Sequence, residues 1–566
     1  MTGPSPLRIG TRGSALALIQ AGIVRDALGR AGVATDIDVI VTAGDTRATD
    51  TPWGEGAFVS TIEAALLDGR IDVAVHSAKD VPTDEDPRTT IGAFLPRADP
   101  RDVIVLPGSR RLASLDGLPP GSRIGTDSPR RGAFLRAARP DLIVQPLHGN
   151  VDTRLGRVDA GDADALVLAA AGLRRLGRLD RVSFVLDPEV VPPAPGQGAL
   201  AVQARSGDRA TLERVRRLDD PKTRRAVEAE RAILAASGGG CRAPLGALGR
   251  VENGELELVC GYAREGGDLW VMVRGRSTDR DDDALVATLI DDLAKSAVAL
   301  ALRSHGPRVV VTRPAGQSAA TLLALVDAGL VPLAVPTIAI EPAPGDALDA
   351  ALGELATFDW VVVTSANAAR AVRAAAARTG TSLAGDGSSR RPRWAVVGAA
   401  TERALAAAGI RADVRPGAAH TRALVDAMPL SEGERILLPR SDQAEDDLPT
   451  ALRSAGAVVR CLAAYRTVAS PAASGPLLAA AMAKRPAAIV FSSGSTVRGL
   501  LGLAAGRADR DRIRAIPAAC VGPRTATVAA ENGFAHITVA AGQDPRGLAD
   551  AALRAVRSVR PEKESR

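Results

Sequence analysis

An internal duplication constrains the fold of this 566-residue chain more than any other sequence feature. Three segments beyond residue 307 recur in the same order: 308–317 resembles 435–443, 361–367 resembles 489–495, and 397–401 resembles 521–525. An alanine-rich predicted helix follows the last segment of each copy. Ordered repeats of this kind indicate two similar strand–helix halves, and two such halves facing one another form a cleft. Chance similarity between alanine- and valine-rich segments is the alternative.

The first 306 residues alternate predicted strands with predicted helices. Strands are predicted at 7–11, 36–41, 71–76 and 165–168, and helices at 14–30, 58–67 and 129–138. This alternation is typical of parallel α/β domains. Proline-rich segments at 96–100 and 191–198 mark crossings between two such domains. Residues 219–306 are predicted to form an α+β unit, with strands at 256–262 and 270–276 and a helix at 282–302.

Composition and charge narrow the function. Hydrophobic residues make up 46% of the chain, no apolar run reaches the ~20 residues of a membrane span, and the N-terminus has no signal-peptide core. Four cysteines are scattered without metal-ligand or disulfide spacing, which fits a reducing cytoplasm. The net charge is +6, but arginines lie among acidic residues and aromatics are only 2%, which argues against nucleic acid. Arginines in loops better suit a small anionic substrate.

The segment VAVHSAKDVPT, residues 73–83, ends a predicted buried strand in polar side chains that include Lys79 and Asp80. Open α/β sheets bind their ligands at the carboxyl ends of strands. A carboxylate at this place can accept N–H bonds from a bound ring and stabilise a cation that forms on it. A solvated turn is the alternative for an isolated Lys–Asp pair.

Two further segments carry residues suited to anion binding and to nucleophilic chemistry. In RIGTDSPRR, residues 123–131, Ser128 is a good helix N-cap, and free backbone N–H groups beside Arg130 and Arg131 would bind an anion. Exposed arginines on a helix surface are the alternative. Three more arginines lie in equivalent loops: Arg12, Arg154 and Arg175. In SGGGCRAP the glycines allow close backbone approach, and Cys241 is either a thiolate nucleophile or a free loop cysteine.

Seven segments resemble the hydroxymethylbilane synthases (porphobilinogen deaminases), in the order found in that family. They are TRGSALALIQA, HSAKDVPT, GTDSPRR, HGNVDTRL, LAAAGLRRLG, PAPGQGALAVQAR and ERAILAASGGGCRAPLGA, within residues 5–306. Residues 307–560 resemble uroporphyrinogen-III synthases through the duplication and through FDWVVVTSANAARAV, AAYRTV and VGPRTATVAA. The resemblance implies a bifunctional tetrapyrrole enzyme. It would condense porphobilinogen to hydroxymethylbilane with loss of ammonia, and then cyclise that product to uroporphyrinogen III.

The resemblance also implies roles for residues of the first module. Cys241 would carry a dipyrromethane cofactor through a thioether. Asp80 and Lys79 would be catalytic, and Lys79 would also help to hold the cofactor and growing chain. The cofactor and growing chain would be held by Thr126, Ser128, Arg130 and Arg131. Substrate carboxylates would be received by Arg12, Ser14, His148, Arg154 and Arg175. Two places depart from the family pattern: Gly54-Glu55-Gly56 replaces Gly-Lys-Gly, and His148-Gly149-Asn150 replaces Arg-Gly-Asn.

For the second module, the resemblance implies a cyclase that needs no metal or cofactor. Thr401, Tyr465 and Thr525 match polar cleft positions near the substrate, and Ser365 is a weaker match. Arg524 stands where the family often has threonine, so no single residue is singled out for catalysis. The first strand of each half is expected to join the opposite domain.

We therefore expect an α/β protein in two modules. The first would contain two doubly wound domains, resembling periplasmic binding proteins, at 5–98 with 198–217 and at 103–192, and a small α+β domain at 219–306 with the cofactor cysteine. The second would contain similar parallel domains at 307–341 with 467–560 and at 342–466. We expect a cytoplasmic monomer that acts on small molecules, without metal, nucleic-acid or membrane partners. The alternatives are a two-lobed solute-binding protein, or a deaminase whose second module is regulatory or scaffolding.

Overall fold

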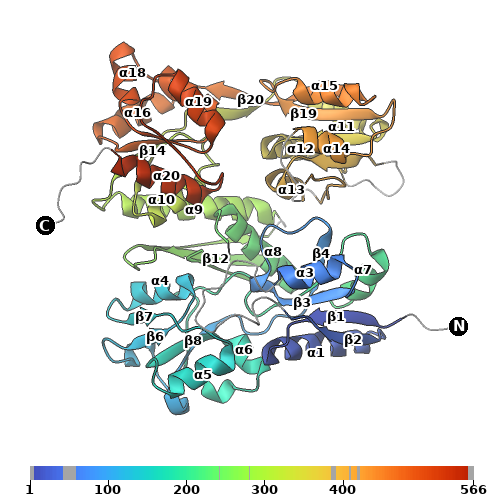
Figure 1. Ribbon diagram of the computed structural model, residues 1–566, viewed down its shortest axis with the longest axis vertical. Coiled ribbons are helices and arrows are strands. Elements are labelled where there is room, and N and C mark those ends of the chain that lie inside the picture. The colour runs from blue at the N-terminus through green and yellow to red at the C-terminus, as the bar shows by residue number, and fades with distance from the viewer. Residues whose placement is uncertain are drawn as a thin grey trace. The chain divides into compact units, whose positions relative to one another are not determined.

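The computed structural model describes residues 5–41, 59–240, 243–278, 281–383, 391–406, 409–416 and 421–558. The chain divides into two compact units (Figure 1). The first comprises Met1–Arg308 with Ser318–Pro332 and Gly542–Leu553, and the second comprises Val309–Gln317, Leu333–Ala541 and Arg554–Arg566. The described residues contain four five-stranded sheets and one three-stranded sheet.

The first sheet has the strand order β2-β1-β3-β10-β4. Its strands are β1 (Leu7–Thr11), β2 (Thr35–Val39), β3 (Val73–Ser77), β4 (Thr89–Phe94) and β10 (Leu200–Arg205). Helices α1 (Ala15–Arg30), α3 (Ser60–Leu67) and α7 (Arg209–Arg216) pack on it. Val73 and Val75 of β3 join the apolar core under α1, whereas Ala74 joins the core under α3. Both faces of β3 are therefore covered, which explains its continuous apolar sequence.

The second sheet has the order β7-β6-β8-β5-β9. Its strands are β5 (Asp102–Val105), β6 (Arg123–Gly125), β7 (Ile143–Gln145), β8 (Ala165–Ala169) and β9 (Phe184–Val185), and its helices are α4 (Pro129–Ala138), α5 (Val151–Asp159) and α6 (Ala170–Arg175). One strand in each of these two sheets departs from the parallel arrangement expected of the domains. Strand β10 runs antiparallel to β3 and β4, and β5 runs antiparallel to β8 and β9. These are the strands by which the chain enters each sheet from the other, and this entry sets their direction.

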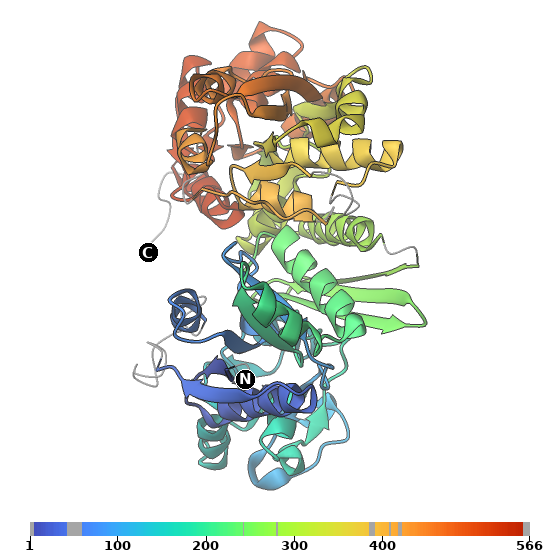
Figure 2. The same ribbon diagram turned by 90° about the vertical axis from the view of Figure 1, so that its right-hand side faces the viewer.

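A three-stranded antiparallel sheet follows, made of β11 (Leu245–Glu252), β12 (Glu255–Ala263) and β13 (Trp270–Ser277). Helices α8 (Pro221–Ala236) and α9 (Asp282–Ala301) pack on this sheet and on each other (Figure 2). Asn253 and Gly254, between β11 and β12, have positive φ angles of 50° and 84°, as a two-residue hairpin turn requires. Asp220 and Asp281 cap the two helices with side-chain hydrogen bonds.

The second unit is built on two further sheets. One has the order β15-β14-β21-β22-β23, with β14 (Arg308–Val311), β15 (Val331–Ala334), β21 (Ala488–Phe491), β22 (Ala518–Cys520) and β23 (Ile537–Val539). The other has the order β16-β20-β19-β17-β18, with β16 (Ile338–Pro342), β17 (Trp360–Val363), β18 (Arg393–Val396), β19 (Arg435–Ser441) and β20 (Val458–Ala469). The first strands of the two repeats are exchanged, because β14 pairs with β21 and β19 pairs with β17.

One boundary differs from the sequence-based expectation. Residues 338–341, expected in the domain with β14, belong to β16, which pairs antiparallel with β20 in the other sheet. The twelve-residue strand β20 is long enough to pair with β19 along its first part and with β16 along its last. Pairing with β16 satisfies backbone groups that would otherwise be left open at the edge of that sheet.

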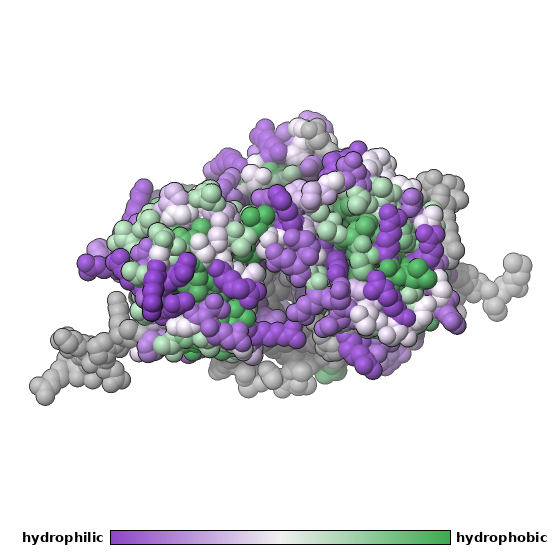
Figure 3. Space-filling view, turned by 90° about the horizontal axis from the view of Figure 1, so that it is seen from above, coloured by the Kyte–Doolittle hydropathy of each residue, from purple (hydrophilic) through white to green (hydrophobic). Residues whose placement is uncertain are grey.

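The helices beyond residue 318 are numerous and short. They are α10 (Ala319–Asp327), α11 (Ala347–Gly353), α12 (Ala366–Thr379), α13 (Ala399–Ala406), α14 (Thr421–Ala427), α15 (Asp447–Ser454), α16 (Ser474–Ala483), α17 (Gly494–Gly502), α18 (Arg507–Arg514), α19 (Pro523–Glu531) and α20 (Pro545–Arg557). Among the described residues no helix is both long and apolar enough to cross a membrane. On the face drawn in Figure 3, polar side chains separate small groups of apolar ones.

Candidate active site

A cavity of about 420 Å³ lies in the first unit, at the carboxyl ends of strands from the first two sheets. It gathers nine residues predicted from the sequence: Arg12, Ser14, Lys79, Asp80, Ser128, Arg130, Arg131, Arg154 and Arg175. We call this cavity the cleft. Ligands of open α/β sheets bind at this position, because the loops and helix N-termini after successive strands meet there. Thr126 and His148 do not line the cleft.

Some of the predicted site residues cannot be placed. Cys241, Arg242 and the segment Gly54-Glu55-Gly56 lie outside the described residues. The three glycines before the cysteine lie within the described residues, and the local geometry explains why position 239 is a glycine. A Cβ atom on Gly239 would lie 2.4 Å from the Cβ of Ala243, so any larger residue would force this tight loop to shift.

The end of β3 presents its polar residues in two directions. His76 is buried and its Nε2 lies 3.0 Å from the Gln203 Oε1. Burial lowers the pKa of His76 to about 4, so the imidazole is neutral at physiological pH. Ser77 faces the cleft and accepts a hydrogen bond of 2.9 Å from the Nε2 of Gln20 on α1. His76 is therefore part of the domain core, and the residues that follow it reach the ligand site.

Lys79 and Asp80 form a short 3₁₀ turn directly after β3. The Lys79 Nζ lies 3.4 Å from the Gln197 Oε1. The pKa of Lys79 is lowered to about 8, mainly by burial and also by the charges of Arg131 and Arg130, although Asp80 and Asp102 raise it. Asp80 is exposed on the wall of the cleft. The turn thus offers an ammonium that titrates near neutral pH beside an accessible carboxylate.

The start of α4 has the predicted capping geometry. Ser128 accepts a hydrogen bond from the backbone N of Arg131, and Pro129 occupies the first turn, where its missing N–H costs nothing. The alternative of exposed surface arginines is wrong, because Arg130 and Arg131 are only 4% and 6% exposed. Both pair with Asp102, the buried first residue of β5.

Arg154 and Arg175 bring two more guanidinium groups to the cleft. The Arg154 Nε donates to the carbonyl of Gly149, and the Arg175 Nη2 donates to the carbonyl of Gly198, both at 2.7 Å. Burial lowers the pKa of Arg175 to about 10 and also lowers that of Arg154. Within the described part of the chain, no carboxylate forms an ion pair with either group. Two partly desolvated cations without a carboxylate partner make a strong site for an anionic ligand.

Three cleft or near-cleft residues were missed by reasoning from the sequence: Gln20, Asp102 and Gln197. Of the three, Asp102 has the clearest sequence signal, because it is a charged residue at the start of an otherwise apolar strand, DVIV. Gln20 lies on the helical stripe of α1, and Gln197 lies in a proline- and glycine-rich crossing. Neither position has a spacing that distinguishes a site residue from a surface amide.

His148 and Thr126 line a separate cavity of about 390 Å³, together with Arg136, Gln145 and Glu265. The His148 Nδ1 lies 2.9 Å from the Oδ1 of Asp127. His148 is thus absent from the lining of the cleft where its contact with a substrate carboxylate is expected, and it lies against Asp127, which lines both cavities. Thr126 shapes the turn before α4, where its Oγ1 accepts a hydrogen bond from the backbone N of Ser128.

This placement predicts that His148 has no effect on the pH dependence of substrate affinity. An imidazole in the cleft would lose its charge near pH ~6.5 and weaken binding above that value. We expect wild type, His148→Arg and His148→Ala to give parallel profiles of KM from pH ~6 to ~8.5 for porphobilinogen, the substrate that the sequence resemblance implies. A KM that rises with pH in the wild type and stays flat in His148→Arg would contradict the prediction.

In the second unit, a cavity of about 650 Å³ is lined by residues that include Gln317, Asn367, Arg370 and Tyr465. The Tyr465 Oη lies 3.2 Å from the Oγ of Ser365, which caps α12. The side chains of Gln317 and Arg370 both donate to the Oδ1 of Asn367, at 3.0 and 2.6 Å. The predicted Thr401 and Thr525 are each only 5% exposed and do not line this cavity. Of the four predicted residues, Tyr465 alone lines it, and Ser365 contacts Tyr465.

No group of three or more His, Cys, Asp or Glu side chains suited to a metal ion occurs among the described residues. The first unit thus presents a cleft lined by arginines, a lysine and aspartates, among them the exposed Asp80 directly after β3. These features define an α/β enzyme or binding protein for a small molecule with several carboxylates.

Comparison with known proteins identifies the family. Residues 7–213 match the family described as "Porphobilinogen deaminase, dipyromethane cofactor binding domain". The chain is 51% identical over 259 residues to the porphobilinogen deaminase of Mycobacterium leprae, which is 46% of this chain and 80% of that protein. It is 47% identical over 294 residues to the porphobilinogen deaminase of Roseiflexus castenholzii, which is 51% of this chain and 95% of that protein. The chain therefore belongs to the porphobilinogen deaminase family.

A second family matches a later part of the same chain. Residues 317–550 match the uroporphyrinogen-III synthase HemD family. A solved mutant uroporphyrinogen-III synthase from Thermus thermophilus is 22% identical, covers 45% of this chain and 100% of its own, and has a TM-score of 0.35. This structural similarity is too low to carry any part of the argument. The family match itself establishes a bifunctional chain, and neither alternative reading of the sequence is favoured.

Proposed function

We propose that this protein performs two consecutive steps of tetrapyrrole biosynthesis. The first module condenses four porphobilinogen molecules into hydroxymethylbilane and releases ammonia at each addition. The second module closes hydroxymethylbilane to uroporphyrinogen III, with inversion of the last ring and loss of water. One observation carries the proposal: both families occur in a single chain whose first module has a cleft of buried arginines around Asp80.

The residues of the cleft fit the dipyrromethane cofactor of the first family. Dipyrromethane carries several carboxylates, and Arg130, Arg131 and Lys79 provide cations for them, with Ser128 at the start of α4. A thioether to Cys241 would anchor the cofactor, which supplies, when bound, the pyrrole to which new units are added. Arg12, Arg154 and Arg175 would then receive the acetate and propionate groups of the incoming substrate.

Asp80 is the residue we assign to the chemical step. Loss of ammonia from porphobilinogen leaves positive charge on the ring system, and a nearby carboxylate stabilises that charge as it develops. The Asp80 carboxylate can also accept pyrrole N–H bonds and so orient the ring. Its exposure on the cleft wall leaves the side chain accessible to such a ring. Lys79 is better suited to binding carboxylates, because its ammonium is held beside Gln197.

For the first module, we further propose a cofactor-carrying domain at 219–306 and two cleft-forming domains before it. For the second module, Tyr465 is the candidate for contact with the substrate, because it lines the cavity there and is held by Ser365. The scattered cysteines fit a cytoplasmic enzyme. We propose that it acts as a monomer.

The function is tested by supplying the full-length protein with porphobilinogen alone. We expect consumption of porphobilinogen and, after oxidation of the products, a predominance of the type III isomer over type I in chromatography. Type I alone would show an active deaminase with an inactive second module. No consumption, in protein whose mass shows the cofactor adduct, would contradict the proposal as a whole.

The fusion predicts that isomer III formation resists dilution. Hydroxymethylbilane released to solvent closes spontaneously to the non-inverted isomer, so a tethered synthase competes best when it is close. The junction at residues 302–308 is short and lacks a Gly/Ser linker, and short tethers give effective concentrations of about millimolar. We expect the isomer III fraction to stay constant as the enzyme is diluted to nanomolar concentration.

The control is full-length Cys241→Ser protein, which supplies the synthase in trans without deaminase activity. If the tether matters, an excess of this variant should leave the isomer III fraction unchanged at low enzyme concentration. A fraction that falls on dilution and recovers when the variant is added would show that the intermediate passes through bulk solvent.

A further inference from the structure

We propose that Asp102 is a positioning residue of the deaminase cleft, which holds Arg130 and Arg131 so that their remaining N–H groups face the ligand. The inference rests on the proposed function of that cleft. Asp102 is fully buried and is not itself among the residues that line the cleft. Its effect on ligand binding must therefore pass through the cleft residues that it contacts or whose charge it influences, above all the two arginines.

The hydrogen bonds show how the arginines are held. The Asp102 Oδ2 accepts from the Arg130 Nη2 at 2.8 Å, and the Oδ1 accepts from the Arg131 Nε and Nη2 at 3.1 and 2.7 Å. Backbone carbonyls of Pro192 and Val167 accept one further bond from each arginine. A guanidinium carries five N–H groups, so these bonds leave at least two on each arginine for a ligand. The buried hydrogen bonds determine which N–H groups of the two arginines remain available to the ligand.

Asp102 is also connected to Lys79. The Gln197 Nε2 donates to the Asp102 Oδ1 at 2.8 Å and to the carbonyl of Pro100 at 2.7 Å, while its Oε1 lies 3.4 Å from the Lys79 Nζ. One carboxylate is thus linked, directly or through one amide, to three cations that line the cleft. Replacing any of these groups would disturb the others, since buried polar networks act as a unit.

The charge of Asp102 is as important as its geometry. Burial would raise its pKa, but the charges of Arg130 and Arg131 and the hydrogen bonds from Arg131 and Gln197 outweigh burial and hold the pKa well below its usual range. Asp102 is therefore ionised throughout the working pH range. Without the Asp102 carboxylate, the two adjacent buried guanidinium groups would lose this partner. Removing one member of a buried ion pair lowers stability strongly, because it leaves a buried charge uncompensated.

The same charge acts on Lys79, whose pKa is about 8. The charged groups that act on this ammonium are Asp80 on its own turn, Arg130 and Arg131 on α4, and Asp102 on β5. Asp102 raises the pKa of Lys79, so removing its charge lowers that pKa. If the Lys79 ammonium binds carboxylates, activity declines as pH rises through its pKa, and this decline must begin at lower pH without Asp102.

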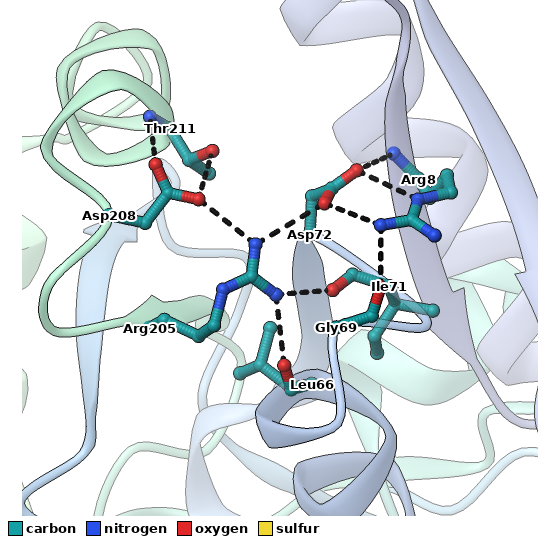
Figure 4. A network of polar contacts seen from close by, with 8 residues as sticks. All are labelled: Arg8, Leu66, Gly69, Ile71, Asp72, Arg205, Asp208 and Thr211. Carbon is teal, nitrogen blue, oxygen red and sulfur yellow. Dashed lines mark hydrogen bonds and ion pairs between the residues drawn. The ribbon is translucent and has the colours of Figure 1, made fainter.

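A matched control exists in the same unit. Asp72 lies between two arginines, as Asp102 does, but away from the cleft (Figure 4). It accepts bonds from the backbone N, Nε and Nη2 of Arg8 at 3.0, 3.1 and 2.9 Å, and from the Arg205 Nη2 at 3.3 Å. Asp72→Asn removes an arginine-bound carboxylate without touching the ligand site. It should lower the melting temperature and leave the cofactor and the pH profile unchanged.

The experiment compares full-length wild type, Asp102→Asn and Asp72→Asn. Intact mass gives the fraction of chains with a dipyrromethane adduct, and initial rates give KM and kcat from pH ~6 to ~9.5. For Asp102→Asn we expect adduct occupancy to fall or KM to rise by roughly tenfold, the size expected for charged hydrogen bonds. We also expect the alkaline limb of its pH–activity profile, where activity declines as pH rises, to shift to lower pH by roughly half a pH unit or more. A variant with reduced stability but wild-type occupancy, KM and alkaline limb would overturn the proposal.

Asp102→Glu keeps the experiment decisive if Asp102→Asn does not fold. Glutamate keeps the charge but moves the carboxylate, so we expect the wild-type alkaline limb with reduced adduct occupancy. Wild-type occupancy and KM in Asp102→Glu would refute the positioning role. Failure of the proposed function is recognised separately, because wild-type protein would then lack the adduct or fail to consume porphobilinogen.

Discussion

Replacing Cys241 with serine is expected to abolish deaminase turnover while leaving the synthase domain active. A thioether needs the sulfur atom, and the serine hydroxyl is too weak a nucleophile at neutral pH to replace it. The variant should therefore fold, lack the mass of the dipyrromethane adduct, and consume porphobilinogen at no more than a background rate. Synthase activity on added hydroxymethylbilane reports that the chain is intact.

The chain offers a matched control for this substitution. Cys461 is a free, partly exposed cysteine of the second module. Cys461→Ser should keep both the adduct and full deaminase activity, because its thiol plays no part in the proposed chemistry. Near-wild-type turnover in Cys241→Ser would contradict the proposal that Cys241 anchors the dipyrromethane cofactor.

Asp80→Asn is expected to lower kcat by roughly two or more orders of magnitude, with a much smaller change in KM. Asparagine keeps the shape and one acceptor oxygen but removes the negative charge that offsets the cation formed when ammonia leaves. The effect should therefore appear in the chemical step. Single-turnover measurement of ammonia release separates this step from product release.

Asp152→Asn is the control for Asp80→Asn, because Asp152 also lines the cleft but lies in the first turn of α5. It removes one negative charge from the same cavity, so it tests whether net charge alone is responsible. We expect kcat within about twofold of wild type, as for most surface charge changes away from the reacting atoms. An effect of Asp80→Asn confined to KM would mean that Asp80 only positions the substrate.

Local structure was predictable wherever short-range chemistry decides it. The strand at Leu7–Thr11 and the helix at Pro129–Ala138 have the predicted bounds. In the helix, Ser128 satisfies a free N–H group and Pro129 fits the first turn, and both effects depend only on neighbouring residues. The cluster of cleft residues was also predictable, because motifs that follow parallel strands meet at one edge of a sheet.

Contacts between distant segments were not predictable in the same way. Asp102 meets Arg130 and Arg131 because β5 lies in the same sheet as the strand before α4, yet β5 runs antiparallel to β8. Nothing in the DVIV segment specifies that direction, since it results from how the chain crosses between sheets. The placement of His148 beside Asp127, in the cavity next to the cleft, depends likewise on the packing of two loops.

The amino-acid sequence by itself determined the repeat, the order of strands and helices, the capped helix starts and the positions of the candidate site motifs. These depend on periodicity, capping and turn chemistry, which act over a few residues. Only the tertiary structure decided which charges are paired and buried and which stay available in the cleft. That choice depends on desolvation and on partners far apart in the chain, and burial makes an unpaired charge costly enough to select one arrangement.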